Sequence, residues 1–101
     1  MTRALDLGCG AGLSTRPLLG LADFCLGVEP AIAMLRCAGE IAPGAHFAAG
    51  AAEAIPVGDH SIDLLAAAGS LNYVKLDRFF PEASRVLTPT GILLVYDFSA
   101  G

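Results

Sequence analysis

The fold of this chain is decided near its N-terminus by the stretch Leu5-Asp6-Leu7-Gly8-Cys9-Gly10-Ala11-Gly12. Its apolar start predicts a buried β-strand over residues 3–7, and the alternating glycines predict a tight turn into a helix over residues 13–21. Glycines in such a turn let a ligand come within contact distance of the main chain. The helix would offer unpaired N–H groups and the positive end of its dipole. The stretch therefore predicts a βα unit with a ligand-binding loop.

The remainder of the chain repeats this alternation of short apolar runs with longer helix-like segments. No repeat, low-complexity segment or linker divides it, so residues 1–101 are expected to form one domain. The alternation is typical of successive βα units and predicts an α/β fold, a Rossmann-like doubly wound parallel sheet of about five strands. Besides residues 3–7, the expected strands cover residues 24–28, 46–49, 62–68 and 92–96, and the later helices cover residues 31–41 and 77–87.

Proline and aspartate mark the expected starts of the two later helices. Pro30 would stand at the first helical position, where proline is tolerated, and Asp77 would cap the last helix. Apolar residues at helical spacing predict the faces that these helices bury. They are Ile32, Met34 and Leu35 in the first helix and Phe79, Ala83 and Val86 in the second. A turn at residues 88–91 would then lead into the last strand.

The composition is more apolar than that of most soluble domains. Hydrophobic residues make up 54% of the chain and charged residues 16%, whereas about 25% is the average charged share. No run reaches the roughly 18 apolar residues that span a membrane. The net charge of −4 comes without a basic cluster, which argues against nucleic-acid binding. Neither a membrane nor a nucleic acid is therefore expected as a partner.

The cysteines bear on the cellular compartment and on metal binding. The chain has three, Cys9, Cys25 and Cys37, and none stands in the CxxC spacing of a zinc site. Neither a disulfide framework nor a metal site is predicted. A signal peptide would need an apolar stretch where Asp6 stands. We therefore expect a reducing, cytoplasmic compartment.

Two nucleotide-binding motifs compete for the glycine-rich loop, and neither fits. A dinucleotide fingerprint needs its third glycine where Leu13 stands, and a P-loop needs a lysine long before Lys75. Glu29 follows Gly12 by 17 residues and closes the second expected strand. Doubly wound folds place there the acid that accepts hydrogen bonds from ribose hydroxyls. A ligand with a free ribose diol is therefore predicted, and the phosphate of NADP would be repelled.

Four segments, taken in order, resemble a single family. They are residues 5–12 (LDLGCGAG), residues 27–30 (GVEP) with Met34, residues 52–56 (AEAIP) followed by residues 59–63 (DHSID), and residues 85–89 (RVLTP) with Gly91. Together they resemble the class I S-adenosylmethionine-dependent methyltransferases of the type 11 domain group over essentially the whole chain. The resemblance implies S-adenosyl-L-methionine as the cofactor and transfer of its methyl group to a small-molecule acceptor.

The resemblance also implies how the sugar and the methionine half of the cofactor are bound. Gly8 and Gly10, on either side of Cys9, would line the methionine half by backbone contact. Asp6 would lie beneath the loop and order both the loop and the ammonium group. Glu29 would bind the ribose diol.

The adenine would be held by segments that follow the second and third strands. Pro30 would pack near the ring, and the Ala52 N–H would meet a ring nitrogen. Many family members carry an aspartate at the position of Ala51 to bind the adenine amino group, so weaker adenine binding is expected here. Past the fourth strand, Ser70 would border the methyl group. The residues expected on the acceptor side are Leu71, Asn72 and Tyr73.

No residue is assigned as a catalytic acid, base or nucleophile. Methyl transfer from a sulfonium mainly requires an in-line approach at near-contact distance. A base is needed only if the acceptor loses a proton in the transition state. His60 is expected to be solvated in a polar turn, and Cys9 to be a small neutral residue with nothing nearby that would ionise its thiol.

Family domains have a helix before the first strand and two strands after the fifth, which this sequence does not show. One alternative is therefore a catalytically incomplete, cofactor-binding fragment of a longer methyltransferase. Another, disfavoured by Leu13, is an NAD-binding Rossmann domain. Missing pieces would leave the fifth strand as an open edge and one sheet face under-covered. We expect the chain alone to be poorly soluble or to form a homo-oligomer through that edge.

Overall fold

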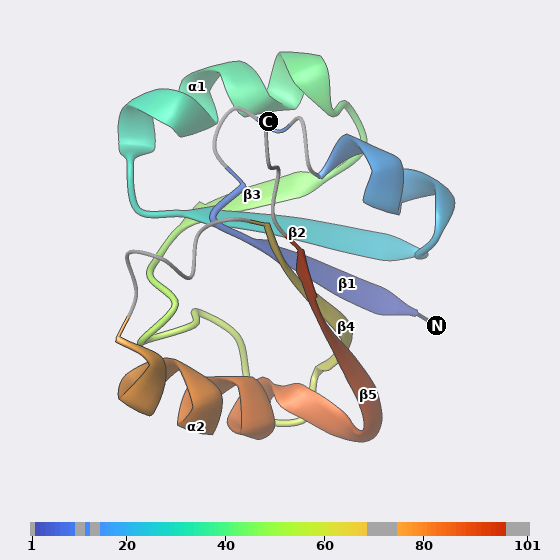
Figure 1. Ribbon diagram of the computed structural model, residues 1–101. Coiled ribbons are helices and arrows are strands. Elements are labelled where there is room, and N and C mark those ends of the chain that lie inside the picture. Colours follow the sequence, from blue (N-terminus) through green and yellow to red (C-terminus); the bar gives the residue numbers. More distant parts are fainter. Residues whose placement is uncertain (1, 10–11, 13–14, 69–74, 97–101) are drawn as a thin grey trace.

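Five parallel strands form the centre of the molecule (Figure 1). The computed structural model describes residues 2–9, 12, 15–68 and 75–96. The strand order is β3-β2-β1-β4-β5, which confirms the predicted doubly wound α/β fold. The elements are β1 (Arg3–Leu7), the 3-10 helix η1 (Arg16–Gly20), β2 (Phe24–Glu29), α1 (Ile32–Ile41), β3 (His46–Ala49), β4 (Ile62–Ala68), α2 (Leu76–Val86) and β5 (Leu87–Tyr96).

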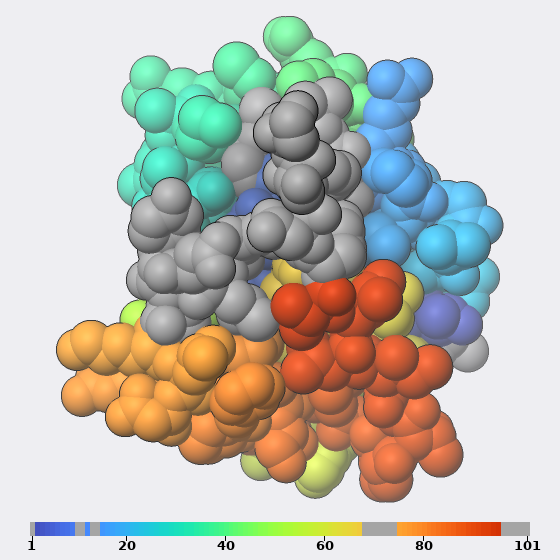
Figure 2. Space-filling view, viewed as in Figure 1, coloured from blue at the N-terminus to red at the C-terminus, as the bar shows by residue number. Residues whose placement is uncertain are grey.

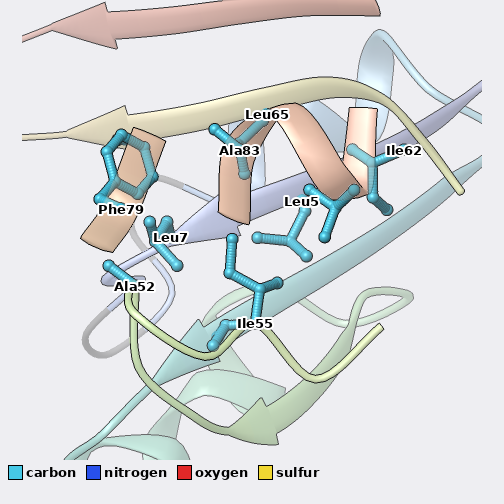
Figure 3. Close-up of a cluster of buried hydrophobic side chains, with 11 residues drawn as sticks. Leu5, Leu7, Ala52, Ile55, Ile62, Leu65, Phe79 and Ala83 are labelled. Atoms are coloured by element: carbon cyan, nitrogen blue, oxygen red, sulfur yellow. The ribbon is translucent and has the colours of Figure 1, made fainter. Parts of the chain in front are cut away.

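The helices cover the two faces of the sheet unequally. Figure 1 shows α1 and η1 on one face and α2 on the other. The larger core lies on the α2 face, and Figure 3 shows its side chains converging from the sheet, α2 and the loop after β3. The α2 residues in it are Phe79, Ala83 and Val86, as the helical spacing predicts. A smaller cluster lies on the η1 face and contains Ala4, Leu18, Cys25 and Ala66.

The predicted strands agree closely with the observed ones. Both bounds of β1, β3 and β4 are as predicted, and β2 is one residue longer because it includes Glu29. Each of these strands is a short apolar run between turn residues, so its pattern is visible locally. β5 begins five residues earlier than Ile92, at Leu87.

The turn predicted at residues 88–91 is a bulge within β5. The pairing of β5 with β4 shifts between Ile62 and Leu64, so residues 88–91 lie opposite Asp63 alone. The Thr88 hydroxyl donates to Asp63 Oδ1 at 3.5 Å. Residues 88–91 therefore have the composition of a turn, but in the structure they form a bulge in the edge strand β5.

α1 buries only part of the face predicted. Ile32 is 62% and Met34 44% exposed, whereas Leu35 is half-buried and Ala38 fully buried. The reason is a close approach of two backbones. A Cβ built on Gly12, whose φ is +96°, would lie 3.1 Å from the Ala38 carbonyl oxygen. Small residues at this contact let α1 pack against the loop without its large apolar side chains.

The starts of α1 and α2 also differ from the predictions. Pro30 precedes the N-cap residue Ala31, which is extended (φ −86°, ψ 100°) and whose N–H donates to the Glu29 carboxylate at 3.1 Å. In α2 the N-cap is Lys75, and Asp77 lies in the first turn. The carboxylate there complements the positive end of the helix dipole instead of capping it.

The helix predicted over residues 13–21 is the short 3-10 helix η1, within the part that the structure describes. Pro17 stands at its start and Gly20 at its end. Proline removes a backbone donor and glycine is a poor helix former, so the pair limits how far a helix can extend. Residues 13–14 of the prediction lie outside the described residues.

Candidate functional site

The carboxyl ends of the parallel strands bring distant parts of the sequence together. In the sheet, Leu7 at the end of β1 is the partner of Val28 in β2 and of Ala67 in β4. The loops that follow these strands therefore begin side by side. Successive strands are added on one side of β1 as β2 and β3 and then on its other side as β4 and β5, so the strand order reverses between β1 and β4. Ligands of doubly wound folds bind outside the strand ends at such a reversal.

The glycine loop after β1 is fastened to the end of β2. Gly8 has a φ of +69°, which favours glycine. The N–H groups of Gly8 and Cys9 both donate to the Val28 carbonyl oxygen, at 2.8 and 3.1 Å, and the Gly12 N–H donates to the Cys9 carbonyl at 3.0 Å. The described amides of the loop thus donate to backbone carbonyls. They do not form the open cradle of N–H groups that binds phosphate.

Asp6, in β1 just before this loop, is fully buried. The hydroxyl of Thr15, also fully buried, donates to Asp6 Oδ2 at 2.7 Å. A hydrogen bond to a buried carboxylate is worth more than one between neutral groups. Sequence reasoning missed Thr15. The available signal was a hydroxyl residue three positions past the last glycine of the loop.

Cys9 is 4% exposed at the start of the loop. Burial, together with the nearby Asp6 and Glu29 carboxylates, raises the pKa of its thiol to about 12. The thiol is therefore protonated at neutral pH and is no nucleophile. This agrees with the prediction of a small neutral residue. A Cβ on Gly27 would lie 3.0 Å from its sulfur, so Cys9 also fills the space that this glycine leaves.

Glu29 occupies the end of β2, beside the glycine loop. It is half-buried, and its Oε2 accepts the Ala31 N–H at 3.1 Å. The Gly50 N–H donates to the Glu29 carbonyl oxygen at 3.3 Å, which joins the end of β2 to the loop after β3. A partly exposed carboxylate at this point can accept hydrogen bonds from a diol. Pro30, the next residue, is exposed.

The loop after β3 carries the two residues expected near adenine. Ala51 is half-buried and Ala52 is 6% exposed. The Ala54 N–H donates to the Ala51 carbonyl at 3.1 Å and forms a short turn. Figure 3 shows Ala52 and Ile55 of this loop among the core side chains beneath the sheet. Apolar packing thus anchors a segment that has little regular structure.

A cluster of charged residues ties the same loop to α2. Arg85 donates to Asp59 Oδ1 at 2.9 Å and to the carbonyl oxygens of Ile55 and Val57 at 2.9 and 2.8 Å. Glu82 Oε1 accepts the Ile55 N–H at 2.8 Å and Arg85 Nη2 at 3.0 Å. The hydrogen bond from Arg85 holds the pKa of the Glu82 carboxyl below its ordinary value. Sequence reasoning placed Arg85 in a matching segment but gave neither residue a role.

The methyltransferase domain family matches residues 5–95. This chain belongs to that family.

Relatives of this methyltransferase domain are longer proteins. An uncharacterized methyltransferase of Mycobacterium tuberculosis is 36% identical over 91 residues, which cover 90% of this chain and 37% of that protein. A malonyl-[acyl-carrier protein] O-methyltransferase of Methylococcus capsulatus is 36% identical and covers 95% of this chain and 37% of its own length. The chain therefore spans about 37% of these curated relatives.

A solved structure supports the same fold. The S-adenosylmethionine-dependent methyltransferase of Mesorhizobium loti superposes with a TM-score of 0.84 at 28% identity. The match covers 92% of this chain and 45% of that one. The Rossmann-like sheet of the methyltransferase domain is thus shown by its relatives as well as by its own strand order.

Several predicted site residues of the methyltransferase domain cannot be placed. Gly10, Ser70, Leu71, Asn72 and Tyr73 lie outside the described residues. Among the residues that are described, no group of three or more His, Cys, Asp or Glu side chains could hold a metal ion. The same residues include no helix long and apolar enough to cross a membrane.

His60 lies away from the strand ends that hold the candidate site. It is exposed just before β4, and its Nδ1 is 2.9 Å from the Leu87 carbonyl oxygen at the start of β5. Its φ of +51° is unusual for a residue other than glycine. This position at the amino ends of the strands agrees with a solvated turn residue.

Proposed function

We propose that this domain binds S-adenosylmethionine and transfers its methyl group to a small-molecule acceptor. The observation that carries the proposal is the character of the glycine loop. Its described amides donate to backbone carbonyls, while the carboxylates of Asp6 and Glu29 stand just before it in β1 and at the end of β2. Carboxylates at these two positions suit a cationic sulfonium and the hydroxyls of a ribose.

The chemistry of the available groups fits the cofactor. Glu29 would accept hydrogen bonds from the ribose hydroxyls, and the loop of Gly8, Cys9 and Gly10 would lie along the methionine half, ordered from below by Asp6. On the adenine side would be Pro30, Ala51 and Ala52, and near the methyl group Ser70. Acceptor contacts would come from Leu71, Asn72 and Tyr73.

When bound, the cofactor supplies an activated methyl group. The role proposed for the chain's own residues is to hold and orient the two reactants, because alignment at near-contact distance accounts for much of such a rate enhancement. No described residue needs to act as a general base if the acceptor transfers no proton in the transition state. A small acceptor is supported by relatives such as the demethylmenaquinone methyltransferase of Renibacterium salmoninarum.

Two further parts of the proposal concern the chain as a whole. We propose that residues 1–101 act as one cofactor-binding unit, which corresponds to part of its longer relatives. We also propose a cytoplasmic location, because Cys9, Cys25 and Cys37 are free thiols and disulfides are rare in that compartment.

Calorimetry with separate ligands tests the cofactor. The unmodified protein should bind S-adenosylmethionine and S-adenosylhomocysteine but not NAD. Glu29→Gln should weaken the binding of S-adenosylmethionine and of S-adenosylhomocysteine by about 10- to 100-fold, the loss expected for hydrogen bonds to a charged acceptor. Glu40→Gln, an exposed change on α1, is the matched control and should bind as the unmodified protein does. Binding of NAD alone would falsify the proposal.

Turnover separates an active enzyme from the alternative of an incomplete, cofactor-binding fragment. The protein is incubated with labelled S-adenosylmethionine and a panel of small-molecule acceptors, and methylated product is counted. Product formation supports the proposed activity. Cofactor binding without product on any acceptor favours the fragment.

A further inference from the structure

The loop after β3 is held by more than its apolar side chains. Its residue Ile55 is 3% exposed in the core, and both backbone groups of the same residue bond to α2. The Ile55 N–H donates to Glu82 Oε1 at 2.8 Å, and its carbonyl accepts Arg85 Nη2 at 2.9 Å. Arg85 Nη1 also donates a hydrogen bond to the Val57 carbonyl oxygen at 2.8 Å. Side chain and main chain are therefore anchored at one point.

Glu82 and Arg85 also fix each other. Arg85 Nη2 donates to Glu82 Oε1 at 3.0 Å, and Arg85 Nε donates to Glu82 Oε2 at 2.5 Å. The two side chains are 19% and 32% exposed, whereas that of Asp59 is 68% exposed. An exposed ion pair such as that with Asp59 contributes little. We call the inner pair the Glu82–Arg85 clamp. Because it is less exposed, it is the part that fixes the position of the loop after β3 relative to α2.

A purely helical role would not require these loop contacts. A pair spaced three residues apart on one helix stabilises that helix modestly through its own attraction. Here the pair bonds to backbone groups of Ile55 and Val57, which are 27 to 30 residues away in sequence. Ala52 lies three residues before Ile55 in the same loop. The clamp therefore determines where the Ala51–Ala54 turn stands at the edge of the sheet.

We propose that Glu82 and Arg85 are positioning residues for the adenine of the cofactor. They would act by holding the loop that carries Ala52, without touching the ligand. This inference rests on the proposed function. It predicts that breaking the clamp degrades recognition of the base while recognition of the ribose at Glu29 and of the methionine half at Gly8 persists.

The test compares two ligands that differ only in the base. Affinities for S-adenosylhomocysteine and S-inosylhomocysteine are measured by calorimetry in the unmodified protein, Arg85→Met and Arg85→Lys. Lysine cannot reproduce the guanidinium fork, so both variants should lower the preference for adenine about fivefold, the worth of one hydrogen bond. Arg78→Met, an exposed change on the same helix, should leave the preference unchanged, and Glu82→Gln, which keeps an acceptor, should lower it less.

The possible results separate the two proposals. If the unmodified protein binds neither ligand, the proposed function fails and the positioning role fails with it. If the unmodified protein prefers S-adenosylhomocysteine to S-inosylhomocysteine and folded Arg85→Met keeps the same preference, only the positioning role is overturned. A merely structural role would lower the melting temperature and leave the ratio of the two affinities unchanged. If Arg85→Met does not fold, the ratio in Arg85→Lys decides.

Discussion

At the scale of single residues, the buried pair of Thr15 and Asp6 is the most exacting feature of the site. A carboxylate without exposure to water depends on its hydrogen-bond donors, and Thr15 supplies one at 2.7 Å. Asp6 precedes the glycine loop and Thr15 follows it, so this hydrogen bond joins the two ends of the loop.

Replacing Thr15 by valine should destabilise the protein measurably. Thr15→Val keeps the shape of the side chain but removes the donor to Asp6, so the free energy of unfolding should fall by about 2 kcal/mol. Urea denaturation measures this change. Thr15→Ser keeps the hydroxyl and is the control. Equal stability of Thr15→Val and the unmodified protein would show that the hydrogen bond contributes nothing.

Ala51 marks the position where many family members carry an aspartate. Ala51→Asp should restore a hydrogen bond to the adenine amino group and tighten S-adenosylhomocysteine binding about fivefold, because one net hydrogen bond is worth about 1 kcal/mol. Calorimetry measures the dissociation constant. Ala54→Asp, on the exposed residue that bridges to Ala51, is the control. An unchanged constant in Ala51→Asp would refute the predicted contact.

At the scale of elements, the attachment of α2 to the loop after β3 should depend on pH. Arg85 holds the pKa of Glu82 below its ordinary value of 4.5. A lowered pKa stabilises the folded state above the ordinary value, and this stabilisation is lost as the pH falls through the lowered one. Glu82→Gln should therefore be less stable than the unmodified protein at pH 7, and the difference should narrow below about pH 4.5.

Denaturant midpoints measured between pH 7 and pH 3 test this dependence. The control is Glu40→Gln, whose carboxylate is exposed on α1, and its difference from the unmodified protein should stay small throughout. A gap between Glu82→Gln and the unmodified protein that remains constant with pH would contradict the role assigned to the carboxylate charge.

The elements also show what the sequence can and cannot predict. Strand bounds are predictable because each strand is a short apolar run between turn residues, and Glu29 and Gly8 are predictable because they stand at strand ends. The buried face of α1 is not, because it depends on the approach of Gly12 to Ala38 from another part of the chain. The role of Arg85 is not predictable either, because its partners in the loop lie up to 30 residues away in the sequence.

At the scale of the whole molecule, apolar side chains remain exposed along one edge. Within the described residues β5 is an edge strand, and Ile92, Leu94 and Val95 on it are 63%, 45% and 51% exposed. Figure 2 shows β5 beside α2 on one face of the molecule. Edge strands with exposed apolar side chains tend to pair with other chains.

The chain alone should therefore self-associate. Sedimentation should show species larger than the monomer at micromolar concentration, and Leu94→Lys should shift them toward the monomer, since a charge on an edge strand opposes pairing. Leu21→Lys, at a residue that is 69% exposed beyond η1, is the control and should leave association unchanged. A monodisperse monomer of the unmodified protein would contradict this prediction.

The junction of Gly8 and Cys9 with Val28 has a consequence for how the family can vary in length. The residues of this junction lie far apart in the chain, yet Leu7 and Val28 are partners in the sheet. The relative position of the two binding segments would therefore depend on the strand register and not on the number of residues between them. Insertions at Gly20, which has nothing within 4 Å of a would-be Cβ, would leave the junction intact. Homologous chains should therefore differ in length there and keep the register unchanged.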